Sequence, residues 1–278
     1  MMKKSWLFLL GIVLLTACQD KKTAEYVIPV AQDETISLTV DRPEKAEAQK
    51  LAFIQHGLAS NQEHPAVQMA KQAFLNSGYV VITFDSRYSI GKSSGAVDNV
   101  RLSTFEEDLN SVINWAKTQK FYAEPFAVAG HSLGGASVLQ YAWEHPSSVS
   151  EVIAITPVVS GALWEESCMR DMTEFCKQWK KNGAFSYQHN GKQVNIPYRV
   201  VEEAKSYNAL DNVHKIKAKT LLVEAQNDTV IPLVDAEKLS QHFPMPRYKT
   251  LISQSGHNFE TPKNQEDLKT ALEFFIQH

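Results

Sequence analysis

Six consecutive residues, Gly130-His131-Ser132-Leu133-Gly134-Gly135, place a serine between glycines in a G-x-S-x-G pattern. This pattern is typical of a nucleophilic serine on a sharp turn between a strand and a helix, so it nominates Ser132 as a nucleophile. Glycine suits both flanks because a turn that raises the hydroxyl above a sheet crowds its neighbours and forces unusual backbone angles. The context fits the pattern, since residues 126–129 form a short apolar run and residues 136–145 have helical spacing.

A serine hydroxyl is a weak nucleophile at neutral pH, so Ser132 needs an adjacent base and a group that orients that base. His257 is the best-placed base, because it lies after the last apolar run of the chain and before the last helical pattern. Asp228 closely follows the apolar run 221–223 and is the predicted orienting acid. Asp235 is the alternative acid, but it falls inside the next helical pattern and is expected to point elsewhere.

From residue 35 onward the chain alternates between strand-like and helix-like stretches. Residues 35–40 alternate apolar and polar side chains, as a half-buried strand does. Short apolar runs that suit buried parallel strands lie at 51–54, 80–84, 126–129, 152–155, 220–223 and 248–252, and helical patterns lie at 65–76, 104–117, 133–145, 233–242 and 265–276. The predicted fold class is therefore α/β, with a mostly parallel central sheet flanked by helices.

One interval interrupts this alternation. Residues 157–219 contain no convincing strand of the central sheet but are rich in aromatic residues. An insertion there would lie above the carboxyl edge of the sheet, where open α/β sheets bind ligands, so we expect a lid at about residues 160–215. Cys168 and Cys176 lie within it, and they form either a disulfide or two reduced thiols. On one continuous helix their Cα atoms would be about 12 Å apart, so a disulfide requires a break between them.

The chain order Ser132, Asp228, His257 is that of the α/β-hydrolases, and the sequence resembles that family over nearly all of its length after residue 17. It is most similar to the branch of small esterases that includes cinnamoyl or feruloyl esterase-like, monoacylglycerol lipase-like and serine aminopeptidase-like proteins. The resemblance implies an α/β-hydrolase fold with its lid after the sixth strand. The family's strand-end His-Gly is matched by Gln55-His56-Gly57-Leu58, which implies an oxyanion hole formed by the N–H groups of Leu58 and Leu133. His56 is then expected to be structural.

A second family motif is matched only in part. Asp85-Ser86-Arg87, followed by Gly91-Lys92-Ser93, resembles the family's Asp-x-Arg-Gly-x-Gly-x-Ser loop. Tyr88 stands where a glycine is usual, and one extra residue precedes Gly91. Since this loop borders the site in the family, the departure bears on substrate choice.

The first residues have the features of an export signal. Lys3 and Lys4 precede an apolar run at 6–15, which is too short to span a bilayer, since a spanning helix needs about 20 residues. Residues 1–17 are therefore predicted to be a signal peptide. Leu15-Thr16-Ala17-Cys18 resembles the lipobox of bacterial lipoproteins, which implies cleavage before Cys18 and lipidation of its thiol; an ordinary secretory signal is the alternative.

Composition narrows the class of partner. The formal net charge is −3 and becomes more negative once the signal peptide is removed, which argues against nucleic acid as a partner. No cysteine or histidine spacing indicates a metal site, and no cofactor is expected. We expect a polar tether at 18–26, one hydrolase domain at 27–278, a small-molecule ester as substrate and a membrane reached through the lipid. Gln19 in place of aspartate favours the outer membrane if the host is Gram-negative.

Three functions remain open from the sequence. The first is a lipid-anchored hydrolase of carboxylic esters that forms an acyl-enzyme on Ser132. The second is a peptidase for short N-terminal or proline-containing peptides, which would need an acidic or carbonyl clamp for the substrate amine, with Glu165, Glu166 and Glu202 as candidates. The third is a binding lipoprotein on a hydrolase scaffold. An assay panel of esters and aminoacyl amides separates them.

Overall fold

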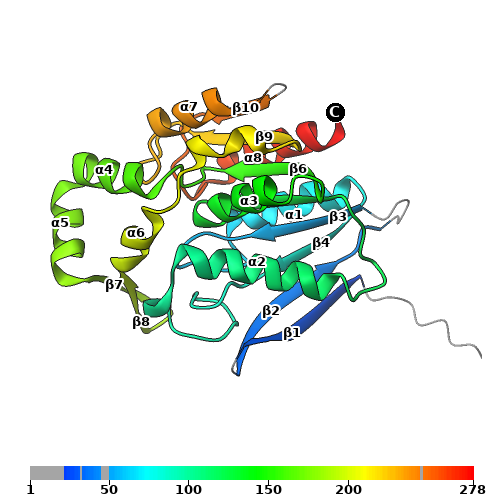
Figure 1. Cartoon of the computed structure of the whole chain (residues 1–278), viewed down its shortest axis with the longest axis horizontal. Coiled ribbons are helices and arrows are strands. Elements are labelled where there is room, and N and C mark those ends of the chain that lie inside the picture. The colour runs from blue at the N-terminus through cyan, green and yellow to red at the C-terminus, as the bar shows by residue number, and fades with distance from the viewer. Residues whose placement is uncertain (1–21, 32, 45–49, 245–246) are drawn as a thin grey trace, which may run out of the picture.

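A single sheet forms the centre of the protein in the computed structural model, which describes residues 22–31, 33–44, 50–244 and 247–278 (Figure 1). Its eight strands lie in the order β1-β2-β4-β3-β5-β6-β9-β10. Their bounds are β1 (Thr23–Ala31), β2 (Glu34–Asp41), β3 (Lys50–Gln55), β4 (Tyr79–Phe84), β5 (Phe126–His131), β6 (Val149–Ile155), β9 (Lys219–Ala225) and β10 (Arg247–Ile252). β1 and β2 pair antiparallel, β2 pairs antiparallel with β4, and the remaining pairs are parallel. The predicted α/β class with a mostly parallel sheet is confirmed.

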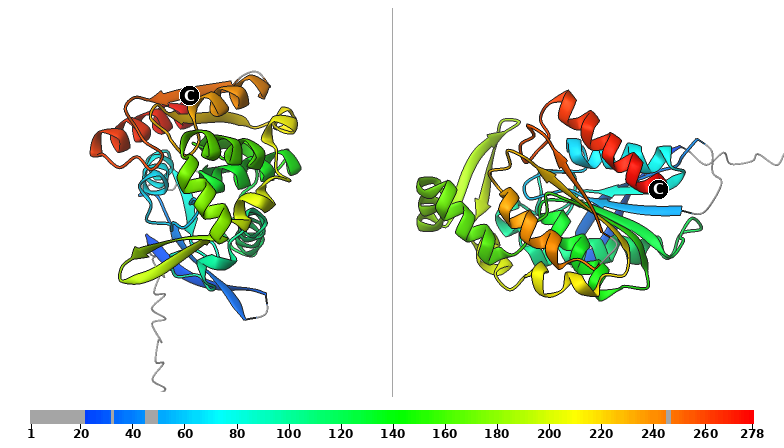
Figure 2. Two further views of the ribbon diagram at one scale, coloured as in Figure 1. Left: turned by 90° about the vertical axis from the view of Figure 1, so that its left-hand side faces the viewer. Right: turned by 90° about the horizontal axis from the view of Figure 1, so that it is seen from above.

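Helices cover both faces of the sheet (Figure 2). One apolar core contains side chains of α1 (Pro65–Asn76) and α8 (Pro262–Gln277), which pack on each other. The other core contains side chains of α2 (Leu102–Ala116), α3 (Leu133–Glu144) and α7 (Leu233–His242). Burial on both faces explains the continuous apolar runs of the parallel strands; Leu51 to Ile54 of β3, for example, is almost fully buried.

The insertion, residues 160–215, follows β6 and lies beyond the carboxyl ends of the parallel strands, on the left of Figure 1. It contains the helices α4 (Gly161–Asp171), α5 (Thr173–Asn182) and α6 (Arg199–Ala204), the hairpin of β7 (Ala184–His189) and β8 (Lys192–Pro197), and the 3-10 turns η2 (Ala209–Asp211) and η3 (Val213–Lys215). A third short 3-10 turn, η1 (Val97–Asn99), precedes α2 and contacts β8. The hairpin forms its own two-stranded sheet, so no strand of the insertion joins the central sheet.

The aromatic residues of the insertion mostly pack against one another. Trp179 lies edge-on to Tyr198 and to Trp164, with ring centroids 5.3 and 6.3 Å apart, and all three side chains are buried. The indole N–H of Trp179 donates to the carbonyl of Ile196, 2.9 Å away, which ties α5 to β8. The aromatic composition therefore supplies the insertion with a small core of its own.

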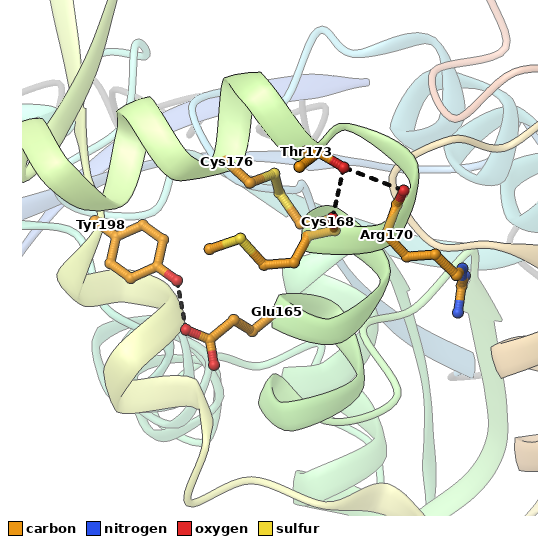
Figure 3. Close-up of a disulfide and its surroundings, with 7 residues drawn as sticks. Glu165, Cys168, Arg170, Thr173, Cys176 and Tyr198 are labelled. Carbon is orange, nitrogen blue, oxygen red and sulfur yellow. Dashed lines mark hydrogen bonds between the residues drawn. A yellow bond between two sulfur atoms is a disulfide. The ribbon is translucent and has the colours of Figure 1, made fainter.

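Cys168 and Cys176 are joined by a disulfide between α4 and α5, with Cα atoms 5.9 Å apart (Figure 3). The helix breaks at Met172, whose backbone angles of φ −128° and ψ 44° lie outside the helical region. The break turns α5 back, so the two cysteines come within the Cα separation that a disulfide allows. Cys176 is fully buried and Cys168 nearly so.

The predicted tether, residues 18–26, is corrected in part. β1 begins at Thr23, so residues 23–26 belong to the sheet. The side chains of Tyr26 and Ile28 point inward while their neighbours are exposed, and Tyr26 packs on Trp115 with ring centroids 4.9 Å apart. This alternation is a strand signal that the polar flanks concealed. The predicted signal peptide, Cys18 and Gln19 lie outside the described residues.

Two global features of the described part of the chain bear on function. No helix there is long and apolar enough to cross a membrane. In the same residues, no three side chains of histidine, cysteine, aspartate or glutamate lie close enough together to hold a metal ion.

Candidate active site

Ser132 lies on the turn between β5 and α3 with φ 55° and ψ −116°, a strained conformation for a residue with a side chain. The neighbouring glycines permit the turn. A Cβ on Gly130 would lie 2.2 Å from the carbonyl oxygen of Gly134, and a Cβ on Gly134 would lie 2.3 Å from the carbonyl oxygen of His56. Both neighbours are backbone atoms, so the spacing of the motif follows from the close approach of α3 to the ends of β5 and β3.

Ser132, His257 and Asp228 are brought together from the ends of three strands. The Nδ1–H of His257 donates to Oδ2 of Asp228 at 2.7 Å, and Nε2 of His257 lies 2.9 Å from Oγ of Ser132. The other carboxylate oxygen of Asp228 accepts the backbone N–H groups of Val230 and Ile231, each at 2.8 Å. The carboxylate is therefore fixed on both sides, and the imidazole presents its free lone pair to the serine hydroxyl.

This arrangement can activate a serine. A neutral imidazole in this tautomer accepts the hydroxyl proton as the oxygen attacks, and the buried carboxylate stabilises the resulting cation. Asp235 takes no part, since it lies in α7 and accepts the hydroxyl of Ser167 at 2.6 Å.

Two backbone N–H groups, those of Leu133 and Leu58, belong to the segments next to Ser132. Leu133 is the first residue of α3, and the N–H groups of a first helical turn have no partner within the helix. Leu58 follows β3, and no acceptor within the described residues takes its N–H. Gly57 brings this turn against the serine, because a Cβ on Gly57 would lie 2.9 Å from the Cβ of Ser132. Both N–H groups are therefore placed to stabilise negative charge beside the serine.

His56 is held as a structural residue. Its Nε2 accepts the backbone N–H of Ser86 at 2.8 Å, and its Nδ1 donates to the carbonyl of Gly57 at 2.7 Å. Burial lowers the pKa of His56, so the ring remains neutral and keeps both bonds. It fixes the turn that carries the N–H of Leu58.

In the loop after β4, contacts of Asp85 and Tyr88 accommodate the departures from the family motif. Asp85 accepts the backbone N–H groups of Gln62 and Lys92, at 2.8 and 2.7 Å, and a Cβ on Gly91 would collide with the Asp85 carboxylate. Tyr88 has φ 58°, the left-handed conformation that glycine adopts at lower cost. Its hydroxyl donates to Glu34 in β2, which offsets part of this strain.

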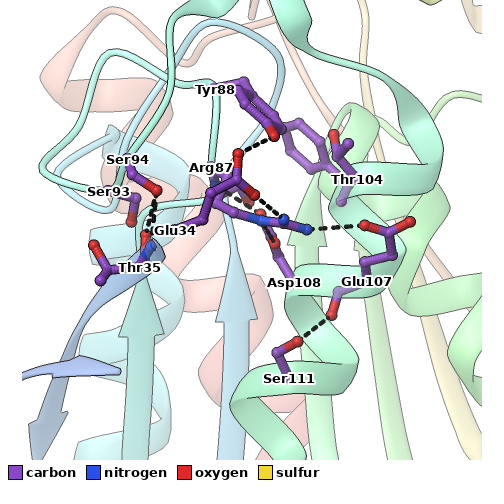
Figure 4. Close-up of polar contacts among 12 residues, drawn as sticks. Glu34, Thr35, Arg87, Tyr88, Ser93, Ser94, Thr104, Glu107, Asp108 and Ser111 are labelled. Atoms are coloured by element: carbon purple, nitrogen blue, oxygen red, sulfur yellow. Dashed lines mark hydrogen bonds and ion pairs between the residues drawn. The ribbon is translucent and has the colours of Figure 1, made fainter. Parts of the chain in front are cut away.

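Arg87 links this loop to α2 and β2 through a buried ion-pair cluster (Figure 4). Its Nε–H donates to Asp108 at 2.6 Å, and its other nitrogens pair with Glu34 and Glu107. Burial disfavours the guanidinium charge, but these carboxylates raise the pKa of Arg87, so the cation is retained. Asp108 is not predicted from the sequence, although a signal exists: it is an acidic residue spaced so that it shares the inward face of α2 with Phe105 and Val112.

The carboxylate of Glu165 is already paired with other side chains of the insertion. It forms ion pairs with Lys180 at 2.9 Å and Lys205 at 2.6 Å, and it accepts the hydroxyl of Tyr198 at 2.6 Å (Figure 3). Hydrogen bonds from Lys205, Tyr198 and Lys180 lower the pKa of Glu165 to about 2. Glu166 and Glu202, the other two acidic candidates for an amine clamp, are exposed to solvent.

The strand order and the serine elbow define an α/β-hydrolase fold, and comparison with solved structures agrees. Est1E from Butyrivibrio proteoclasticus, solved with ferulic acid bound, superposes with a TM-score of 0.72 at 18% identity, covering 91% of this chain and 98% of that one. The esterase domain of a Rhodothermus marinus protein superposes with a TM-score of 0.67 at 19% identity, covering 92% and 98%. The predicted fold is confirmed.

Sequence comparison gives the family. Residues 46–209, more than half of the chain, match the family described as serine aminopeptidase, S33, and the chain belongs to this family of hydrolases. An uncharacterized 31.7 kDa protein from the traX-finO intergenic region of Escherichia coli is 24% identical over 229 residues, covering 72% of this chain and 79% of that protein. The predicted resemblance to the α/β-hydrolases is confirmed.

The elbow geometry predicts that Gly134→Ala unfolds the site. The added Cβ would lie 2.3 and 2.7 Å from two carbonyl oxygens at the end of β3, which cannot move without breaking the sheet. We expect Tm to fall by more than ~8 °C, with loss of activity. Gly183→Ala is the matched control: at φ 74° with no atom within 4 Å, it should cost only the left-handed strain and lower Tm by about 2–4 °C. Equal Tm values for the two variants would contradict this account.

Proposed function

We propose that this chain is a serine hydrolase of carboxylic esters, and the observation that carries the proposal is the hydrogen-bonded chain Asp228–His257–Ser132. Oγ of Ser132 attacks the ester carbonyl while its proton passes to Nε2 of His257. The same proton then goes to the leaving alcohol as the C–O bond breaks, which gives the acyl-enzyme. Water attacks this ester, its proton returns through His257 to Oγ, and the carboxylic acid is released.

The oxyanion of each tetrahedral intermediate is assigned to the N–H groups of Leu58 and Leu133. Such donors act in a preorganised site, and removing one costs about 3 kcal/mol of transition-state stabilisation. The likeness to Est1E, solved with ferulic acid, and to an esterase domain supports ester substrates for the same fold. We assign no cofactor to this reaction, because the three side chains and the two N–H groups together supply nucleophile, base, orientation and charge stabilisation.

A peptidase activity is the second candidate, because the matching family is described as serine aminopeptidase. An aminopeptidase must bind the ammonium group of its substrate near the nucleophile. Glu165 is already paired with two lysines, and Glu166 and Glu202 are exposed, so none of the three provides a buried, unpaired carboxylate for that group. This argues for the ester over the aminoacyl amide, and a panel of both substrate types tests it.

We further propose that the insertion acts as a lid. Its hairpin reaches the turn that carries Leu58, where the hydroxyl of Tyr187 lies 3.5 Å from the carbonyl of Ala59. A segment in contact with this turn is positioned to select the group attached to the scissile ester. The Cys168–Cys176 disulfide fixes the angle between α4 and α5 within that segment.

We also propose that the protein is exported and anchored by lipid on Cys18, at the outer membrane if the host is Gram-negative. The lipobox-like residues 15–18 support this. Because β1 begins at Thr23, at most five residue steps separate Cys18 from the sheet, and these span no more than ~18 Å when fully extended. An anchored protein would therefore lie close to the bilayer surface rather than on a long tether.

The first prediction from this proposal concerns the three reacting groups. Ser132→Ala and His257→Ala should each lower kcat/KM for a p-nitrophenyl ester by roughly 10⁴- to 10⁶-fold, because triad members act as a unit. Asp228→Asn should cost somewhat less. Circular dichroism serves as the control for folding, and Asp235→Asn serves as the matched carboxylate control with near-normal activity. A folded Ser132→Ala protein that retained a tenth of the activity would exclude this nucleophile.

The second prediction concerns the disulfide. In the entropy model a closed ring of nine residues contributes about 2–3 kcal/mol, and it acts on the lid alone. Cys168→Ser should therefore change KM for bulky aryl esters more than for small acetyl esters, and it should change Tm little. The double variant Cys168→Ser/Cys176→Ser controls for reductant effects, since its kinetics should not respond to reduction. Unchanged kinetics in Cys168→Ser on both ester classes would remove the link between the disulfide and selectivity.

The third prediction concerns the anchor. Cys18→Ser should release the protein from the membrane fraction or leave it unprocessed, because the acyl chains supply about 0.8 kcal/mol per buried CH₂. Fractionation and intact mass measure both outcomes, and Cys168→Ser is the matched cysteine control that stays in the membrane. Recovery of the wild-type protein in the cytoplasm would contradict the export proposal.

A further inference from the structure

Three imidazole rings lie in a row beside the candidate active site. The ring of His131 stacks on that of His64, with centroids 4.5 Å apart and planes 18° apart. On its other side it packs against His257, with centroids 4.8 Å apart. His131 is the residue before Ser132, so the strand that carries the nucleophile also contacts the ring of the base.

His131 holds the main chain of His257. Its Nε2–H donates to the backbone carbonyl of His257 at 2.9 Å, and the side chain is almost completely buried. Its Nδ1 is buried against Gly57 and accepts no hydrogen bond within the described residues. Burial lowers the pKa of His131 well below its ordinary value, so the ring is neutral, with its single proton on the nitrogen that faces His257.

The next two residues of the loop are held by the same pair of rings. The side chain of Asn258 lies close enough to His64 to act on the pKa of that ring, which it raises against the larger effect of burial. Phe259 is fully buried and lies edge-on to His131, with centroids 6.3 Å apart. Three consecutive residues of the loop that follows β10 thus each contact His131 or His64, which indicates a fixed loop rather than a mobile one.

His64 is itself fixed by the fold. It is the N-cap of α1, where its Nδ1 accepts the backbone N–H of Ala66 at 3.2 Å. This bond leaves the proton on Nε2, the nitrogen directed away from the helix. Burial lowers the pKa of His64 to about 4, so the ring stays neutral and can stack on His131 without charge repulsion. The row of rings therefore connects the start of α1 to the loop that carries His257.

We propose that His131 is a positioning residue for His257, supported from behind by His64; the inference rests on the proposed function, in which His257 is the base. The side chain of His257 is aimed by Asp228, but its main chain needs a separate anchor, because residues 254 and 259 of the same loop both have positive φ. His131 supplies that anchor through one hydrogen bond and one ring contact. A misplacement of about 1 Å at a reacting group can cost 10²-fold in rate.

His131→Leu removes both the N–H donor and the imidazole ring, and it fills the buried site with an apolar side chain. We expect kcat for a p-nitrophenyl ester to fall roughly 10- to 100-fold, with KM within about twofold of wild type. His131→Gln keeps an N–H donor at a similar reach and should restore kcat to within ~5-fold. His64→Asn retains an N-cap side chain for α1 but removes the stacked ring, and it should give a smaller loss of kcat.

A measurement independent of turnover is the far-downfield proton resonance of Nδ1–H between His257 and Asp228. It should broaden or shift in His131→Leu and recover in His131→Gln. Leu139→Ala on α3 is the matched stability control, since it empties a fully buried apolar site in the core that contains α2 and α3. Its Tm should fall by as much as that of His131→Leu or more, while kcat and the resonance remain near wild type.

The outcomes separate this inference from the function on which it rests. If Ser132→Ala and His257→Ala abolish activity but folded His131→Leu retains wild-type kcat and resonance, His131 does not position the base. The same conclusion follows if His131→Gln is as impaired as His131→Leu in both readouts. If His257→Ala is itself fully active, the proposed function fails first, whatever the His131 variants do.

Discussion

The close packing of the first turn of α3 against the ends of β3 and β5 is the constraint on which the site depends. Gly134 approaches the carbonyls of Gln55 and His56 so closely that no side chain fits. This approach forces Ser132 to φ 55° and aims its hydroxyl above the sheet. It also brings the start of α3, with its unpaired N–H groups, beside the turn that carries the N–H of Leu58. The position of Ser132 and the positions of these N–H groups are thus consequences of one backbone contact, because neither could shift without moving the helix.

The loop after β4 shows a different way of fixing a position. Arg87 is buried with three carboxylates around it, and an ion pair of this kind costs desolvation that its own attraction barely repays. Its effect is geometric, because the guanidinium ties β2, α2 and the loop together at fixed angles. Glu34 also accepts the hydroxyl of Tyr88, so the residue that replaces the family's glycine is held by the same cluster. The substitution of tyrosine for the family's glycine at position 88 therefore places a bulky aromatic side chain in this loop, and the Glu34–Arg87 cluster holds it there.

The central sheet could be predicted from the sequence because its inner parallel strands are buried on both faces and form short apolar runs, while β2 alternates apolar and polar side chains; all seven predicted strands and all five predicted helices are present. Asp228 and His257 could be predicted because the strand ends fix their place. The first residues of β1 fall within the predicted tether because residues 19–25 are mostly polar. The β7–β8 hairpin is not predicted from the sequence, although Asn190 and Gly191, both with positive φ, suit a two-residue turn. The contacts of His131 and the partner of Asp108 could not be inferred, since they join side chains from segments whose packing a linear pattern does not encode.

The helices of the insertion are held together by links that are separate from the candidate active site, and Glu165 forms several of them. Its carboxylate joins Lys180 of α5, Lys205 after α6 and Tyr198, while the disulfide joins α4 to α5, so the three helices are connected by polar and covalent links as well as by their aromatic core. None of these links uses a residue that contacts Ser132, His257 or Asp228. These particular links can therefore change without altering the hydrogen bonds among Ser132, His257 and Asp228, which are made by residues that follow β5, β9 and β10. Under the proposed function, the reaction type is assigned to the residues after β5, β9 and β10 and the substrate preference to the insertion, and the partial match of the loop at Tyr88 concerns only the second.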